Sequence, residues 1–161
     1  MRHSLPPTHP IRTLAAGLLP LLALVLFAGT AHALDPINKT WFGDLAVKGY
    51  DPVAYFNEGK PVEGSEAYEY EWKDATWRFA NAENRAEFID APEKFAPQYG
   101  GYCAYAVSQG VTADIDPEAW KIVNGKLYLN VSQSIQRTWE RSIKGYIRKA
   151  DANWPRILKE G

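Results

Sequence analysis

The sequence predicts an α+β fold, a small single domain with short antiparallel hairpins packed against several short helices. Residues 67–72 and 76–79 alternate aromatic or apolar residues with polar ones, which predicts a hairpin with one solvated face. Residues 120–123 and 126–129 flank Asn124-Gly125, a strong signal for a second hairpin. Between and after the hairpins, capping residues precede segments with helical spacing of apolar residues, and these segments supply the helices.

The elements before the second hairpin follow from local signals. In the N-terminal segment, residues 34–46, we expect Trp41-Phe42 to dock on the domain. Asp51 precedes Pro52, so its carboxylate is expected to cap a short helix at residues 52–56, with Pro52 in its first turn, rather than to act as an acid. Asn81 caps a helix at residues 82–90 in the same way.

The remaining helices are predicted from caps and breakers. Residues 92–99 are expected to form a short helix or turn, closed by Gly100-Gly101. Ser132 caps a helix that runs through Ile135, Trp139 and Ile143, and a last helix spans residues 146–154 and ends before Pro155.

Residues 1–33 have the features of a secretory signal peptide. Arg2 and Arg12 precede an apolar run at residues 14–29, and Ala31-His32-Ala33 is typical of a cleavage site. The apolar run is shorter than a membrane span requires, which favours removal over anchoring. We therefore expect cleavage after Ala33, a domain at residues 34–161, and a periplasmic or secreted protein.

The composition after cleavage excludes several classes of function. Without Arg2 and Arg12, 16 of the 18 basic residues remain against 19 acidic ones, a net charge of −3. Nucleic acid and, after cleavage, a membrane are therefore not expected as partners. All three histidines and the single methionine lie in residues 1–33. The remaining chain can form neither a zinc or copper site from Cys and His within one protomer nor a histidine-assisted nucleophile.

The order of motifs in residues 48–105 resembles the YHS domain family. The matching segments are residues 49–56, 77–88, 91–95 and 100–103, and the segments through Trp120 and residues 150–155 are similar to the exported bacterial branch of the family. The resemblance covers most of residues 34–161 and implies the fold of that family.

The resemblance does not extend to the metal ligands of the family. Metal-handling relatives carry cysteines at the positions of Ala54, Ala80 and Asn84, and the His and Ser of the family name match Ala80 and Asn81. Because these ligands are replaced, metal handling is not implied here. Some relatives are described as selenoproteins, and a selenocysteine matching Cys103 would imply redox chemistry at that position.

Cys103 is the candidate catalytic residue, because it is the one cysteine of the chain. It follows Gly100-Gly101 and precedes a segment with helical character, and a helix N-terminus favours the thiolate form of cysteine. The alternative is a buried, structural cysteine packed among Tyr and Ala, since free cysteine often behaves as a small apolar residue.

Four aromatic residues near Cys103 are the candidate ligand-binding residues. Tyr99, Tyr102, Tyr105 and Trp120 could line a pocket for a small organic molecule through stacking or cation–π contacts. The alternative is that these rings form the core of a small domain.

The acidic run around Pro117 is a weak candidate for a cation site. Asp114, Asp116 and Glu118 offer oxygen ligands, but they match no calcium loop. A cap in front of Pro117 accounts for Asp116 without a metal.

These observations lead to one functional prediction with two alternatives, and they do not decide whether the protein is an enzyme. We predict a periplasmic YHS-like protein that uses Cys103 for redox chemistry or ligand binding, with a small molecule or an external thiol protein as partner. The first alternative is a non-catalytic binding module with a structural Cys103. The second is a soft-metal site, such as Cu(I), shared between the Cys103 residues of two chains, because no cofactor site is evident within one chain.

Overall fold

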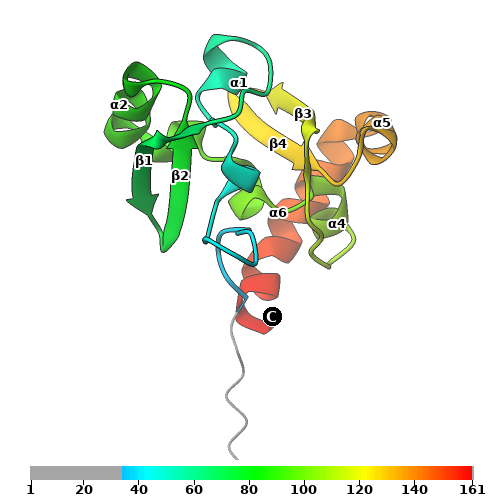
Figure 1. The fold of residues 1–161 in the computed structure, drawn as a ribbon. Helices are drawn as coiled ribbons and strands as arrows, with labels where there is room; N and C mark the ends of the chain where they lie inside the picture. Colours follow the sequence, from blue (N-terminus) through cyan, green and yellow to red (C-terminus); the bar gives the residue numbers. More distant parts are fainter. Residues whose placement is uncertain (1–33, 161) are drawn as a thin grey trace, which may run out of the picture. The chain divides into compact units, whose positions relative to one another are not determined.

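The computed structural model describes residues 34–160 (Figure 1). The predicted signal peptide, residues 1–33, lies outside the described residues. The described part confirms the α+β class, with two separate two-stranded antiparallel sheets among short helices. Its elements, in chain order, are η1 (Val47–Gly49), α1 (Ala54–Asn57), β1 (Ser65–Trp72), β2 (Ala75–Phe79), α2 (Ala82–Asp90), α3 (Pro92–Phe95), η2 (Gln98–Gly101), α4 (Ala104–Ser108), β3 (Asp116–Val123), β4 (Lys126–Asn130), α5 (Gln133–Glu140) and α6 (Ile143–Glu160).

The first predicted hairpin is confirmed as β1 and β2. Lys73 and Asp74 form its two-residue turn, both with positive φ (52° and 56°), as a primed hairpin turn requires. One face of the hairpin carries Trp72 and Trp77, whose rings pack against Phe88 of α2. In Figure 1 this hairpin and α2 lie together on the left.

The second predicted hairpin is confirmed as β3 and β4. Asn124 and Gly125 form its turn with φ of 51° and 73°. Leu127 and Leu129 of β4 belong to the same buried cluster as the first hairpin, and Tyr128 points into a second buried cluster with Trp139 of α5.

The helix predictions are confirmed in part. Asn81 and Ser132 cap α2 and α5, each accepting a hydrogen bond from the backbone N–H three residues later. The predicted helix through Ile143 is interrupted after α5, and Ile143 begins α6 instead.

The prediction that the last helix ends before Pro155 is wrong, because α6 continues through Pro155 to Glu160. Proline removes only one intrahelical hydrogen bond. Ile157, which lies beyond it, is buried against the second cluster, and this packing holds the last turn of the helix in place.

The N-terminal segment docks on the domain, but through a different residue from the one predicted. Ile37 is buried in the first cluster, and the N–H of Asn38 donates to the carbonyl of Gly100 at 2.8 Å. Trp41 and Phe42 were expected to make this contact, and that expectation is wrong: they lie in an exposed turn, 92% and 84% accessible. The turn is closed by the hydroxyl of Thr40, which donates to the carbonyl of Phe42, so the two rings point away from the core.

Candidate functional site: an aromatic cleft

Cys103 lies in the core of the domain. Its side chain is 0% exposed, and its Sγ lies 3.7 Å from the Oδ1 of Asn130, which is also fully buried. The residue precedes α4, as predicted, but its side chain makes no capping hydrogen bond, while its backbone N–H donates to Ala113. A reagent or partner can reach this thiol only if the surrounding core opens.

Asn130 holds the segment around Cys103 to the second hairpin. Its Oδ1 accepts a hydrogen bond from the N–H of Tyr105 at 3.2 Å as well as contacting the thiol. Its Nδ2 has no hydrogen-bond partner among the described residues. The thiol and amide are therefore packed together inside the protein, on the α4 side of β4.

Ala54, Ala80 and Asn84, the positions compared above with the metal ligands of YHS domains, converge on one buried carboxylate. Asp51 is 0% exposed, and its Oδ1 accepts from the N–H groups of Val53 (2.8 Å) and Ala54 (3.2 Å). Its Oδ2 accepts from the N–H of Ala80 (2.8 Å) and the Nδ2 of Asn84 (2.6 Å). The predicted cap on α1 is thus confirmed, and the same carboxylate also ties α1 to the start of α2.

The four aromatic residues predicted to bind a ligand do not share one pocket. Tyr99 and Tyr102 both pack against Trp154 of α6, whereas Tyr105 packs against Tyr146 near the start of that helix. Trp120 lies in the other buried cluster, where its ring contacts Tyr55. Of the four, only Tyr99 lines the cleft described next.

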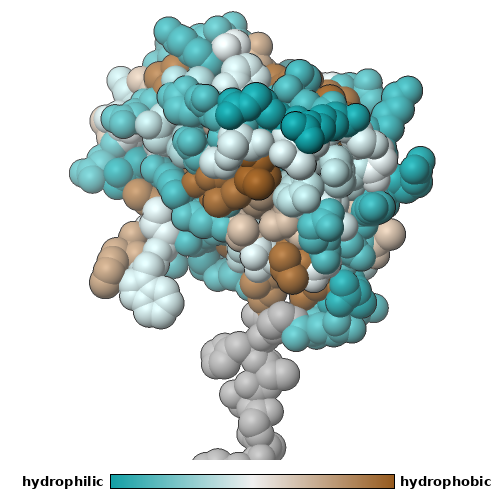
Figure 2. All heavy atoms as spheres, turned by 90° about the vertical axis from the view of Figure 1, so that its right-hand side faces the viewer, coloured by the Kyte–Doolittle hydropathy of each residue, from teal (hydrophilic) through white to brown (hydrophobic). Residues whose placement is uncertain are grey.

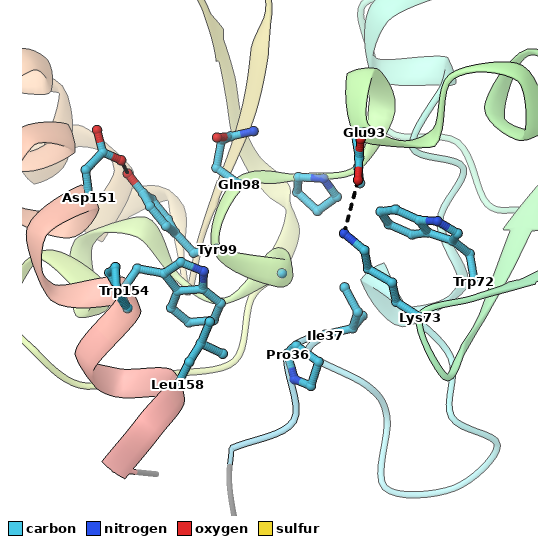
Figure 3. A pocket seen from close by; sticks show the side chains of 14 residues that line it. Pro36, Ile37, Trp72, Lys73, Glu93, Gln98, Tyr99, Asp151, Trp154 and Leu158 are labelled. Atoms are coloured by element: carbon cyan, nitrogen blue, oxygen red, sulfur yellow. Dashed lines mark hydrogen bonds and ion pairs between the residues drawn. The ribbon is translucent and has the colours of Figure 1, made fainter.

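The aromatic cleft is a hollow of about 450 Å³ between the first hairpin, the N-terminal segment and α6 (Figure 3). Three aromatic side chains stand in its walls, together with one lysine and two carboxylates. Its lining consists of Pro36, Ile37, Trp72, Lys73, Glu93, Ala96, Pro97, Gln98, Tyr99, Gly100, Asp151, Trp154, Pro155 and Leu158. Its volume lies in the range typical of small-molecule sites.

One wall of the cleft is built around Tyr99 and α6. The Tyr99 hydroxyl donates to Oδ1 of Asp151 at 2.8 Å, and the rings of Tyr99 and Trp154 meet edge to face at 6.0 Å. Burial, together with the hydrogen bond to Asp151 and the charge of its carboxylate, raises the pKa of Tyr99 above its usual range. The phenol therefore remains a donor and fixes the carboxylate in this wall.

The facing wall comes from the turn of the first hairpin and from α3. The Nζ of Lys73 lies 4.2 Å from the centre of the Trp72 ring and 3.4 Å from Oε1 of Glu93. Figure 3 shows these three side chains on the side of the cleft opposite Tyr99, Asp151 and Trp154. An ammonium group thus already rests on one aromatic face of the cleft.

Gly100 lets the N-terminal segment close the bottom of the cleft. Its φ is +60°, and a Cβ atom built on it would lie 1.9 Å from the carbonyl oxygen of Pro36. Only glycine fits this close approach, which brings Pro36 and Ile37 beside Tyr99.

The acidic run is occupied by protein contacts. Asp114 forms an ion pair with Lys48 at 2.8 Å, and Asp116 accepts a hydrogen bond from the N–H of Glu118 at 3.0 Å. Asp116 begins β3 and does not precede a helix. Its carboxylate therefore stabilises a local turn and is not the predicted helix cap. Within residues 34–160, no three His, Cys, Asp or Glu side chains are grouped as a metal site would need.

The face drawn in Figure 2 is mainly hydrophilic, with hydrophobic side chains in small separate patches. Among residues 34–160, no helix has the length and apolar character required to cross a membrane.

Sequence reasoning missed three important residues of the cleft: Trp72, Asp151 and Trp154. Asp151 and Trp154 lie three residues apart inside the predicted helix, a spacing that signals one shared face, whereas the expected end before Pro155 hid Leu158. No local signal identifies Trp72, because only the tertiary packing places the first hairpin across the cleft from α6.

Comparisons with known proteins leave the family open. No family model matches the chain, and neither the curated proteins nor the solved structures contain a significant match. The function must therefore be argued from the chemistry of the site.

Proposed function

We propose that this protein is an exported, YHS-like binding module without catalytic activity, in which Cys103 is structural and the aromatic cleft holds a small organic ligand. One contrast carries the proposal: the cleft is open and rich in aromatic and charged groups, whereas Cys103 is 0% exposed. A ligand site needs apolar walls with a few fixed polar groups, and the cleft has both.

The resemblance to YHS domains supports a binding role without a metal. The carboxylate of Asp51 occupies the point on which the replaced ligand positions converge, and four N–H donors already satisfy it. This arrangement stabilises the fold where metal-handling relatives carry ligands. The ligand site that we propose is therefore the aromatic cleft and not the surroundings of Asp51.

The thiol-based alternatives both require Cys103 to become accessible. Redox exchange needs an external thiol to reach Sγ, and a shared Cu(I) site needs a second chain to approach it. In both cases the contact between Cys103 and Asn130 would have to open, because both side chains are fully buried.

The first test is a fragment titration of residues 34–161 followed by two-dimensional NMR. A mixture of small soluble amines, carboxylic acids, sugars and aromatic alcohols is added, and the indole N–H signals of the six tryptophans are assigned and followed. We expect shifts at Trp72 and Trp154 but not at the fully buried Trp139. If no fragment shifts the signals of the cleft, the binding function is wrong.

The second test measures the rate at which iodoacetamide alkylates Cys103 in the native protein and in urea. A structural thiol reacts only on unfolding, so labelling should be at least about a hundredfold slower in the native state. Rapid labelling, or copper that copurifies with a dimer, would favour a thiol-based function instead. Cys103→Ala should retain the ligand shifts at Trp72 and Trp154.

The export of the protein is tested by expressing the full chain and sequencing the mature N-terminus. We expect the protein in the fraction outside the cytoplasm, beginning at Leu34. Full-length protein retained in the cytoplasm would contradict export but would leave the cleft proposal unchanged.

A further inference from the structure

We infer that the ligand of the aromatic cleft is a small organic cation, such as an alkylated ammonium compound, bound on the α6 wall by Asp151 and Trp154. The inference rests on the proposed binding function and names the chemical class of its ligand.

The charge balance of the cleft favours a cation. The lining holds one cation, Lys73, and two carboxylates, Glu93 and Asp151. Lys73 is paired with Glu93 across 3.4 Å. Among residues 34–160, the ion pairs within 4.0 Å leave Asp151 without a lysine or arginine partner. One carboxylate of the cleft therefore has no ion-pair partner among the described residues.

The neighbouring basic residues of α6 in the described part of the chain form no ion pair with Asp151 within 4.0 Å. Lys144 and Arg148 line a separate groove with Val123 and Ile147, and Asp151 stands at the border between that groove and the cleft. Neither basic side chain forms an ion pair with Asp151. Within residues 34–160, the Tyr99 hydroxyl is the one side chain that hydrogen-bonds Asp151, and this bond orients its carboxylate.

Pro155 removes one helical hydrogen bond next to Asp151. In an α-helix the N–H of residue 155 would donate to the carbonyl of residue 151, and proline has no N–H to donate. The backbone carbonyl of Asp151 is therefore deprived of this helical partner, and Pro155 itself lines the cleft. The Pro155 ring crowds that carbonyl, so Pro155 contributes an apolar surface to the cleft beside the Asp151 carboxylate.

The aromatic rings of the cleft match a cation better than an anion. The face of an indole attracts positive charge, most strongly for an alkylated ammonium that water solvates poorly. The protein itself demonstrates this contact on the facing wall, where the Lys73 ammonium lies over the Trp72 ring beside the carboxylate of Glu93. Trp154 with Asp151 repeats the same pair of groups on α6, without a protein cation.

The decisive experiment compares choline with its neutral isostere 3,3-dimethylbutan-1-ol, in which carbon replaces the quaternary nitrogen. Each is titrated into residues 34–161, and the indole N–H shift of Trp154 reports binding. We expect choline to bind at least about tenfold more tightly, because only choline carries the charge that the rings and Asp151 attract.

Two variants of α6 distinguish the effect of the Asp151 carboxylate on choline binding from the effect of the protein's net charge. Asp151→Asn keeps an oxygen that can accept from Tyr99 but removes the charge, and it should weaken choline binding about tenfold. Glu160→Gln removes the same charge from the same helix, where Glu160 pairs with Arg156 outside the cleft. This control should leave the affinity within about twofold. Circular dichroism and the melting temperature establish that both variants are folded.

The outcomes distinguish the inference from the function on which it rests. Equal binding of choline and the alcohol, or equal affinity of Asp151→Asn and the original protein, overturns the cation inference while leaving a binding cleft. A shift of Trp154 by carboxylic acids but not by choline also overturns it. If neither compound nor any fragment of the mixture shifts the cleft signals, the binding function itself fails.

Discussion

Replacing Asp51 by Asn tests whether the buried carboxylate holds the domain together. The carboxylate accepts four hydrogen bonds and is 0% exposed, so no water can replace a lost partner. An Asn side chain can keep its oxygen toward Val53 and Ala54. Its NH₂ group then faces the N–H of Ala80 and the Nδ2 of Asn84. All three groups are hydrogen-bond donors, so neither of the two original hydrogen bonds can form.

The size of the effect follows from these two lost bonds. A hydrogen bond to a charged group contributes about 1.5–3 kcal/mol, and an unsatisfied buried donor costs about 1–3 kcal/mol. Rotation of the Asn84 amide would offer its oxygen to the new donor and restore one of the two bonds. We therefore expect Asp51→Asn to lower the free energy of unfolding by about 2–4 kcal/mol.

The assay is urea unfolding of residues 34–161, followed by tryptophan fluorescence and circular dichroism. Asp116→Asn is the matched control, because Asp116 accepts a single hydrogen bond, from the N–H of Glu118, that asparagine can also accept. It should change the free energy of unfolding by less than about 0.5 kcal/mol. A loss below about 1 kcal/mol for Asp51→Asn would refute the argument that this carboxylate joins α1 to α2.

Three further predictions concern the cleft floor, an ion pair and the exposed turn. Gly100→Ala should lower the free energy of unfolding by more than about 2 kcal/mol in urea, because its Cβ would overlap a main-chain carbonyl. Gly125→Ala shares the positive φ but meets open space and should cost about 1 kcal/mol; similar losses would contradict the overlap. Although partial burial opposes it, the hydrogen bonds from Lys48 and nearby amides hold the pKa of Asp114 below its usual range. The stability that this carboxylate contributes is present above about pH 4 and is lost as pH falls through its folded pKa, so Asp114→Asn should flatten the acid limb of a pH titration of unfolding. Trp41→Ser should change the melting temperature by less than about 2 °C in calorimetry, since a ring 92% exposed contributes little to the core.

Local signals in the sequence were sufficient to predict both hairpins and several helix caps. The two hairpins, the caps at Asn81 and Ser132 and the carboxylate cap of Asp51 depend on residues close together in the chain. Turn geometry and capping involve only a few consecutive residues, so their chemistry can be read from the sequence. The exposure of Trp41 and Phe42 could not be read in this way, because hydrophobic character alone does not reveal whether a neighbouring surface is available.

The candidate site shows the division between sequence and structure most clearly. Composition alone establishes that residues 34–161 contain one thiol and no histidine, and the local sequence made Tyr99 a candidate for ligand binding. The burial of Cys103 and the contacts of Tyr99 with Asp151 and Trp154 arise only when the chain is folded. The physical reason is distance along the chain: Tyr99 and Asp151 are 52 residues apart, and the packing of α6 through Pro155 brings them together.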